Sequence, residues 1–154
     1  MINKIFIGSD HAGIELKKSL IGSFPQFQWQ DLGPFDSSSV DYPDFADRVC
    51  RKVISTPNSF GVLICGSGQG MSIRANKYLG IRAALCWSTE IAELSRKHNN
   101  ANVLCLGARF ISEPKAVEIL QSFLSTAFEG GRHQQRVDKL SYPTNNDGYE
   151  KHTS

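Results

Sequence analysis

Residues 61–72 read GVLICGSGQGMS, an apolar run that ends in a cysteine and continues into three glycines at alternate positions. Such a short, nearly continuous apolar run is typical of a strand that is buried on both faces of a parallel sheet. The glycines allow backbone N–H groups to converge on an anion, and the helix expected after them would add the positive end of its dipole. This stretch therefore predicts an anion-binding edge of an α/β sheet.

The same alternation of strand and helix patterns extends along the rest of the chain. Apolar strand-like runs occur at residues 4–8, 27–33, 60–65, 80–86 and 101–107. Residues 45–53 and 116–124 carry apolar side chains at helical spacing instead. We predict an α/β fold, a Rossmann-like three-layer αβα sandwich with a five-stranded parallel sheet. Ligands of such folds bind at the carboxyl ends of the strands.

The chain length of 154 residues suits one domain, which we expect to span 1–154 with a C-terminal helical extension and a polar tail from about residue 144. A net charge of +2 without a clustered basic patch argues against nucleic acid as a partner. No apolar run approaches the roughly 20 residues that span a bilayer, and the N-terminus has no signal-peptide pattern. The four cysteines show no metal-binding spacing, which predicts reduced thiols in a cytoplasmic protein.

Cys65 at the end of the quoted strand has two interpretations. Cysteine is a common buried strand residue, so Cys65 could be a small hydrophobe and nothing more. It could also be a reactive thiol, since a helix N-terminus favours the thiolate. The GxGxG spacing after Cys65 differs from the dinucleotide-binding fingerprint GxGxxG. Glu90 nevertheless lies about where an acid that binds the ribose of a dinucleotide would fall. A nicotinamide-binding site is therefore weakly indicated and not excluded.

The stretch GSDHAG, residues 8–13, brings Asp10 and His11 to the end of the first expected strand. Polar residues there face the ligand crevice, although Asp10 could simply cap the next helix. The glycine spacing is that of a P-loop, but Ile14 and Glu15 stand where its Lys and Ser/Thr would be. A nucleotide triphosphatase is therefore excluded.

Two further stretches carry candidate residues. SRKHNNANVL, residues 95–104, contains His98 and Asn99, and a histidine there is either a helix-terminal cation or a functional group. GGRHQQR, residues 130–136, has Arg132 and Arg136 four positions apart, on one face if the segment is helical. Two guanidinium groups on one face suit a phosphate, although a solvated surface is the commoner reason for such a pair.

Taken together, these motifs resemble a known family. GSDHAG, DYPDFA, CGSGQGMSIRANK, GIRAALC, SRKHNNANVLCLGAR and EGGRHQQR occur in order over residues 2 to about 140. They resemble the type B ribose-5-phosphate isomerases, a group that includes the galactose-6-phosphate isomerase subunits and allose-6-phosphate isomerase. The resemblance implies an aldose–ketose isomerase of the pentose phosphate pathway that needs no cofactor or metal and works through a cis-enediolate.

The resemblance also implies roles for residues. Cys65 matches the base that removes the C2 proton, and the amides of the loop that includes Gly66 and Gly70 match the hole for the enediolate oxygen. Ser67 matches a hydroxyl that assists the thiol. One branch of the family has serine at the cysteine position and a glutamate base four residues later. Gln69 cannot titrate, so this chain resembles the cysteine branch.

The remaining matches concern the rest of the sugar phosphate. His98 matches the residue that opens the sugar ring, with Asp10 as its partner. Tyr42 and Asn99 match residues that contact hydroxyls or the enediolate. The phosphate set is His11, Arg109, Arg132 and Arg136.

The resemblance further implies a homodimer, or a dimer of dimers, with each active site shared between two subunits. The segment with His98, Asn99 and Arg109 is expected to face the neighbouring Cys65, and Asp10 and His11 are expected on the cysteine side. The expected partner is a small sugar phosphate, without nucleic acid or membrane. Two alternatives stay open, an aldohexose-6-phosphate isomerase and a non-catalytic anion-binding module. The binding module does not explain why Cys65, His98 and Asp10 occur together.

Overall fold

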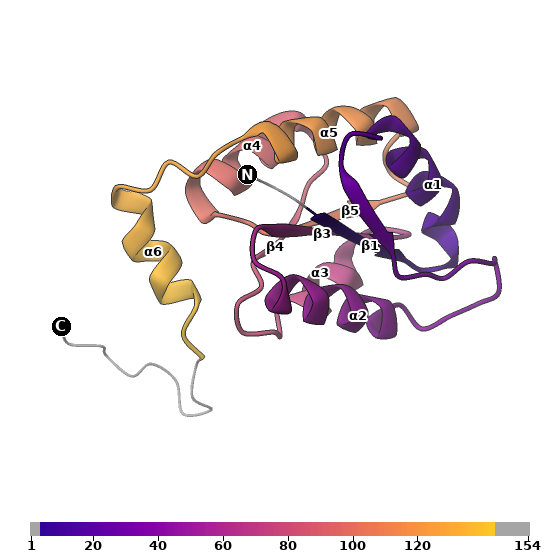
Figure 1. Ribbon diagram of the computed structural model, residues 1–154, viewed down its shortest axis with the longest axis horizontal. Coiled ribbons are helices and arrows are strands. Elements are labelled where there is room, and N and C mark those ends of the chain that lie inside the picture. Colours follow the sequence, from indigo (N-terminus) through magenta and orange to yellow (C-terminus); the bar gives the residue numbers. More distant parts are fainter. Residues whose placement is uncertain (1–3, 144–154) are drawn as a thin grey trace.

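The computed structural model describes residues 4–143, which form a parallel sheet covered by helices on both faces (Figure 1). The strands are β1 Lys4–Ser9, β2 Gln28–Asp31, β3 Ser59–Cys65, β4 Ala83–Leu85 and β5 Val103–Gly107. Their order in the sheet is β2-β1-β3-β5-β4, and every neighbouring pair is parallel. The predicted fold class is confirmed.

The helices divide between the two faces. They are a 3-10 turn at His11–Gly13, α1 Ile14–Ser23, α2 Tyr42–Ser55, α3 Gln69–Ala75, α4 Thr89–Asn99, α5 Glu113–Ser125 and α6 Arg132–Leu140. Because alternate side chains of a strand point to opposite faces, Ile5 and Ile7 pack with α1 and α5, whereas Phe6 packs with α2 and α3. The central strands β3 and β5 are buried along their whole length, as continuous apolar runs require.

The outer strands are shorter than the apolar runs that predicted them. β2 covers 28–31 rather than 27–33, and Gly33 follows it at a φ of +93° that does not continue a strand. β4 covers 83–85 rather than 80–86. Ahead of it, the Arg82 N–H donates to the Asn102 side chain at 2.8 Å in place of a ladder bond.

The expected C-terminal helical extension is α6, which stands apart from the body of the domain and packs chiefly against α4 (Figure 1). It buries only His133 and Val137. The predicted polar tail from residue 144 lies outside the described residues. Within residues 4–143, no helix is both long and apolar enough to span a membrane.

Candidate active site

The loop after β3 holds the Cys65 sulfur. Gly68 has a φ of +78°, and a Cβ there would lie 2.5 Å from Leu85 and 3.0 Å from the Leu106 carbonyl carbon, so only glycine fits. This conformation directs the Gly68 N–H to the Cys65 Sγ at 3.1 Å. α3 begins at the next residue, Gln69. The thiol therefore accepts one backbone N–H of the glycine loop that the sequence predicted to bind an anion.

The other three cysteines have a different environment. Burial raises the pKa of Cys50 to about 12 and of Cys86 to about 11, and it raises the pKa of Cys105 well above its usual value. These thiols are inert parts of the core. Cys65 is also buried, at 5% exposure, but its sulfur accepts a backbone N–H at the carboxyl edge of the sheet. Its position at the sheet edge thus differs from that of the other three thiols.

Tyr42 lies directly on the backbone of Gly70. A Cβ at Gly70 would be 2.3 Å from the Tyr42 Cζ and 2.6 Å from its hydroxyl oxygen. The two helices that carry these residues are joined by Arg74, whose Nε and second guanidinium nitrogen donate to the Asp47 carboxylate at 2.7 and 3.0 Å. Arg74 lowers the pKa of Asp47 for this reason. The pair thus links α3 to α2, the helix that begins with Tyr42.

Asp10 and His11 follow β1 beside the same loop. The Asp10 N–H donates to the Ile64 carbonyl at 3.0 Å, and its Oδ1 accepts the Ala12 N–H at 2.9 Å. Asp10 therefore caps the 3-10 turn, as the simpler interpretation predicted, and it also lies next to the end of β3. His11 is exposed at the start of that turn.

Arg109 lies on the cysteine side of the sheet. Its N–H donates to the Gly66 carbonyl at 3.0 Å, and a guanidinium nitrogen is 3.1 Å from where a Gly66 Cβ would be. Within one chain, Arg109 thus lies beside the cysteine loop and apart from His98, with which the resemblance grouped it. The reason is that the turn after β5 folds back on β3, with the Ala108 N–H donating to the Cys65 carbonyl at 2.9 Å.

A hollow of about 250 Å³ opens beside Ser67. It is lined by Ser67, Gln69, Leu85, Cys86, Trp87, Gly107, Phe110 and Ile111. Trp87 and Phe110 are 61% and 77% exposed, and the sequence analysis missed both. They could have been found, because each follows the end of a strand, where ligand-facing residues of α/β folds occur.

His98 and Asn99 lie at the other edge of the sheet. They end α4, and the chain then enters β5 at Val103, which pairs with Gly61 near the start of β3. Cys65 pairs with Gly107, four residues further along β5, about 13 Å away at the usual strand rise. One chain thus has two separate groups of predicted site residues.

The first group, here the loop cluster, is Asp10, His11, Tyr42, Cys65–Gly70 and Arg109. The second, here the α4–α6 cluster, is His98, Asn99, Arg132 and Arg136. In the second cluster the His98 ring stacks on His133, with centroids 4.2 Å apart and 13° between the planes. Burial, His98 and Arg132 lower the pKa of His133. Arg132 and Arg136 are exposed on α6.

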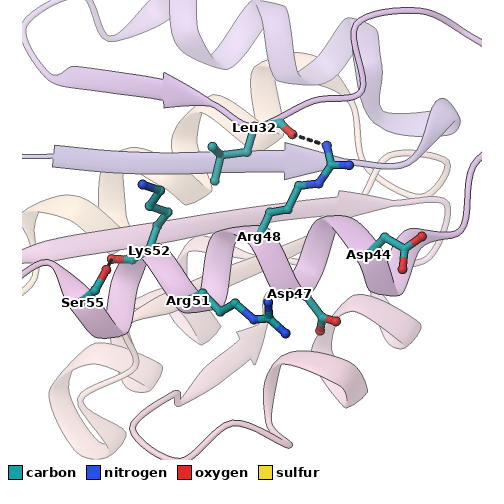
Figure 2. A pocket seen from close by; sticks show the side chains of 7 residues that line it. All are labelled: Leu32, Asp44, Asp47, Arg48, Arg51, Lys52 and Ser55. Atoms are coloured by element: carbon teal, nitrogen blue, oxygen red, sulfur yellow. Dashed lines mark hydrogen bonds between the residues drawn. The ribbon is translucent and has the colours of Figure 1, made fainter.

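A second hollow of about 650 Å³ lies along α2 and contains none of these residues (Figure 2). Its charged groups have both signs, and the central ones are engaged. Arg48 donates to the Leu32 carbonyl at 3.3 Å and lies over the Phe45 ring, while Asp47 holds Arg74. This hollow is therefore not the candidate site.

A buried thiol above an amide loop, at the carboxyl edge of a parallel sheet, is what the resemblance predicted. The family model described as ribose/galactose isomerase matches residues 5–140, and the chain belongs to this family. Relatives within it carry the name ribose-5-phosphate isomerase B. The protein of Escherichia coli is 40% identical over 142 residues, which are 91% of this chain and 95% of that protein. The probable enzyme of Mycoplasma genitalium is 48% identical over 141 residues, 88% of this chain and 92% of that one.

Solved structures agree. Ribose 5-phosphate isomerase B from Thermotoga maritima has a TM-score of 0.88 and 47% identity, covering 90% of this chain and 97% of that one. The Mycoplasma genitalium enzyme with bound ribulose-5-phosphate has a TM-score of 0.85 and 46% identity, covering 92% and 95%. The predicted family is confirmed.

Proposed function

We propose that this chain interconverts ribose 5-phosphate and ribulose 5-phosphate, a step of the non-oxidative pentose phosphate pathway. Relatives at 40% and 48% identity over most of both chains are named ribose-5-phosphate isomerase B, the second as probable, and a structure at 46% identity contains ribulose-5-phosphate. The observation that carries the proposal is the Gly68 N–H donated to the Cys65 Sγ at 3.1 Å. It places the proposed base against one amide of the glycine loop at the carboxyl edge of the sheet.

The reaction moves one hydrogen from C2 to C1 and one from O2 to O1. Cys65, as the thiolate, removes the C2 proton of the open-chain aldose, and the C–H electron pair forms the C1–C2 double bond of a cis-enediolate. The aldehyde oxygen becomes the enediolate oxygen and is held by the loop amides, Gly66 and Gly70 included. The Cys65 thiol then returns its proton to C1. Preorganised amides away from water are usually the largest catalytic contribution.

Ser67 moves the proton between the two oxygens. Its Oγ accepts the Gln69 N–H at 3.3 Å, which holds the exposed hydroxyl at the mouth of the loop. Gln69 has no titratable proton and takes no part as a base. No metal or cofactor is proposed, and activity is expected to persist after treatment with EDTA.

The other residues open and hold the sugar phosphate. His98 transfers the proton that opens the furanose ring, a task that suits an imidazole because it can both donate and accept a proton, and Asp10 is its partner. Tyr42 and Asn99 contact the hydroxyls or the enediolate. The phosphate is bound by His11, Arg109, Arg132 and Arg136.

The separation of the two clusters supports a homodimer with shared sites. His98 ends a helix at the amino edge of the sheet, and Cys65 ends a strand at the carboxyl edge, so His98 of one chain serves Cys65 of the other. In this arrangement Arg109 remains with the loop cluster of its own chain. The exposed rings of Trp87 and Phe110 beside Ser67 are apolar surface that a second subunit would cover. A twofold axis would generate two equivalent sites.

Cys65→Ala tests the chemistry. The variant is expected to fold and to bind sugar phosphate. Its turnover should fall by at least about 10²–10⁴-fold, the factor that a general base typically contributes. Gln69→Ala is the control on the same loop and should lose far less. Near-normal turnover of folded Cys65→Ala, or an equal loss in Gln69→Ala, contradicts the assignment. Comparing rates on ribose 5-phosphate, allose 6-phosphate and galactose 6-phosphate decides between a pentose and a hexose substrate.

Mixing inactive Cys65→Ala and His98→Asn chains tests the sharing. After subunit exchange, a mixed dimer should regain one intact site, so activity should return. If labelled chains prove that exchange took place and no activity returns, the two residues act within one chain.

A further inference from the structure

Three side chains from separate elements converge beside α6. His98 lies in the last turn of α4, His133 in the first turn of α6, and Glu129 in the segment between α5 and α6. Each offers one ligand atom, and these atoms all lie within 4.8 Å of one another. The His133 Nε2 and the Glu129 carboxylate are 3.6 Å apart. The proposed function uses only His98 of these three.

Backbone contacts hold the three groups together. Arg96 on α4 donates from Nε to the Thr126 carbonyl at 3.2 Å, and the Glu129 N–H donates to the Lys97 carbonyl at 3.1 Å. These two hydrogen bonds hold the segment between α5 and α6 against the end of α4. Gly130 and Gly131, with φ of +64° and +54°, then turn the chain into α6. This turn brings His133 onto His98.

We propose that His98, Glu129 and His133 bind a zinc-like divalent transition-metal ion. Two imidazoles and one carboxylate, with an open position for water, form a donor set that zinc accepts. Ligand bonds of about 2.1 Å place neighbouring donor atoms of a tetrahedral ion about 3.4 Å apart, so the three donors must approach by up to roughly 1.4 Å. Glu129 is exposed and can move, and the two stacked rings must splay so that their lone pairs converge.

The surroundings favour a transition metal over calcium or magnesium. Arg132 and Arg136 on the same helix oppose a cation that is held by charge alone. Hard cations also prefer sets of oxygen ligands, whereas this site offers two imidazoles. Zinc is therefore expected to bind and magnesium is not.

The consequence for activity rests on the proposed function. A metal on His98 takes a lone pair of the imidazole that the proposed function uses for proton transfer in ring opening. Zinc is then a reversible inhibitor of the isomerase, and EDTA restores the rate. This role differs from that of a cofactor, because the metal-free enzyme is the active form.

The first experiment measures metal binding without reference to activity. The full chain is stripped with EDTA, desalted and titrated with Zn²⁺ by calorimetry. We expect one ion per chain, with the affinity lowered at least about tenfold in His133→Gln and in Glu129→Gln, since even indirect partners of a metal site cost that much. Glu118→Gln on α5 is the matched surface control, and Cys65→Ser must keep the wild-type affinity. An unchanged affinity in both test variants, a loss in Cys65→Ser, or no binding overturns the site.

The second experiment measures inhibition. Glu129→Gln is expected to have wild-type turnover without metal and to resist Zn²⁺ at least about tenfold better than the wild type. Equal sensitivity of the two enzymes refutes the link to His98, even if the ion binds. If the chain proves to have no isomerase activity, the calorimetric result still decides the metal site.

Discussion

Replacing Gly70 by alanine tests the contact that holds Tyr42 at the loop. The added methyl carbon would lie 2.3 Å from the Tyr42 Cζ and 2.6 Å from both Cε2 and the hydroxyl oxygen. Ordinary carbon contacts are about 3.5–4.0 Å, so the ring has to retreat by more than about 1 Å. Tyr42 is 38% exposed, and its ring can swing towards solvent without disturbing the core.

The expected change in stability is small because two effects offset each other. Gly70 lies in α3 at a φ that alanine accepts, and alanine is favoured over glycine in a helix by about 0.5–1 kcal/mol. The displaced ring loses part of its packing, a cost of similar size for a partly exposed side chain. The free energy of unfolding should therefore change by less than about 1 kcal/mol.

Activity should respond much more strongly. A displacement of about 1 Å at a substrate contact can cost about 10²-fold, so kcat/KM is expected to fall by about 10- to 100-fold. Denaturant unfolding and steady-state kinetics on the same preparation separate the two effects. Gly22→Ala in α1 is the matched control, because nothing lies within 4 Å of its added Cβ. It should gain helix stability and leave kcat/KM unchanged.

A double-mutant cycle identifies the cause. With Tyr42→Ala in the background, Gly70→Ala should stabilise the protein by about 0.5–1 kcal/mol and cause no further loss of activity. Additive losses of kcat/KM would mean that the methyl group acts on the loop amides and not through Tyr42. Wild-type kcat/KM in Gly70→Ala, with the ring shown to have moved, would remove Tyr42 from the substrate site.

Two further predictions concern charged side chains. Arg132→Ala and Arg136→Ala should chiefly raise KM for the sugar phosphate, because phosphate is bound equally in ground and transition states. Lys139→Ala on the same helix is the control. An unchanged KM with a reduced kcat in the arginine variants contradicts the phosphate-binding role. Asp47→Asn should lower the free energy of unfolding by up to about 1 kcal/mol at neutral pH, a small amount because the pair with Arg74 is partly exposed. The folded pKa of Asp47 is lowered, so its stabilisation is present above the unfolded value of about 3.9 and disappears as the pH falls through the folded pKa. A wild-type minus Asp47→Asn difference that stays constant through urea unfolding from pH 7 to pH 2 would refute this account.

The fold was predictable because the sequences of strands buried on both faces of a parallel sheet are uninterrupted apolar runs. The ends of β3 and β5 agree with the predicted runs, and their starts differ by one and two residues, since both faces of each strand are covered. Apart from Arg109, the loop cluster was predictable for a related reason: in this fold the residues that follow strands face one common edge. Cys65 ends the run that predicted β3 and Asp10 follows the run that predicted β1, and both residues lie at the carboxyl edge of the sheet.

Arg109 and His133 were not predictable in the same way. The side on which Arg109 lies depends on a turn that folds back on Gly66, and this packing has no sequence periodicity. The stacking of His98 on His133 joins residues 35 positions apart, through two glycines with positive φ. Contacts between elements, unlike the elements themselves, have no local pattern to reveal them.

The separation of the two clusters follows from the topology and not from the details of the loops. In a parallel α/β sheet, each strand leads into a helix at the carboxyl edge, and each helix leads into a strand at the amino edge. Cys65 belongs to the first kind of connection and His98 to the second, with β5 between the two edges. Rearranging the loops of one chain would not bring them together unless a strand came apart. If the reaction needs both residues, its site has to lie between chains, and dissociation of the dimer would then end catalysis in chains that remain folded.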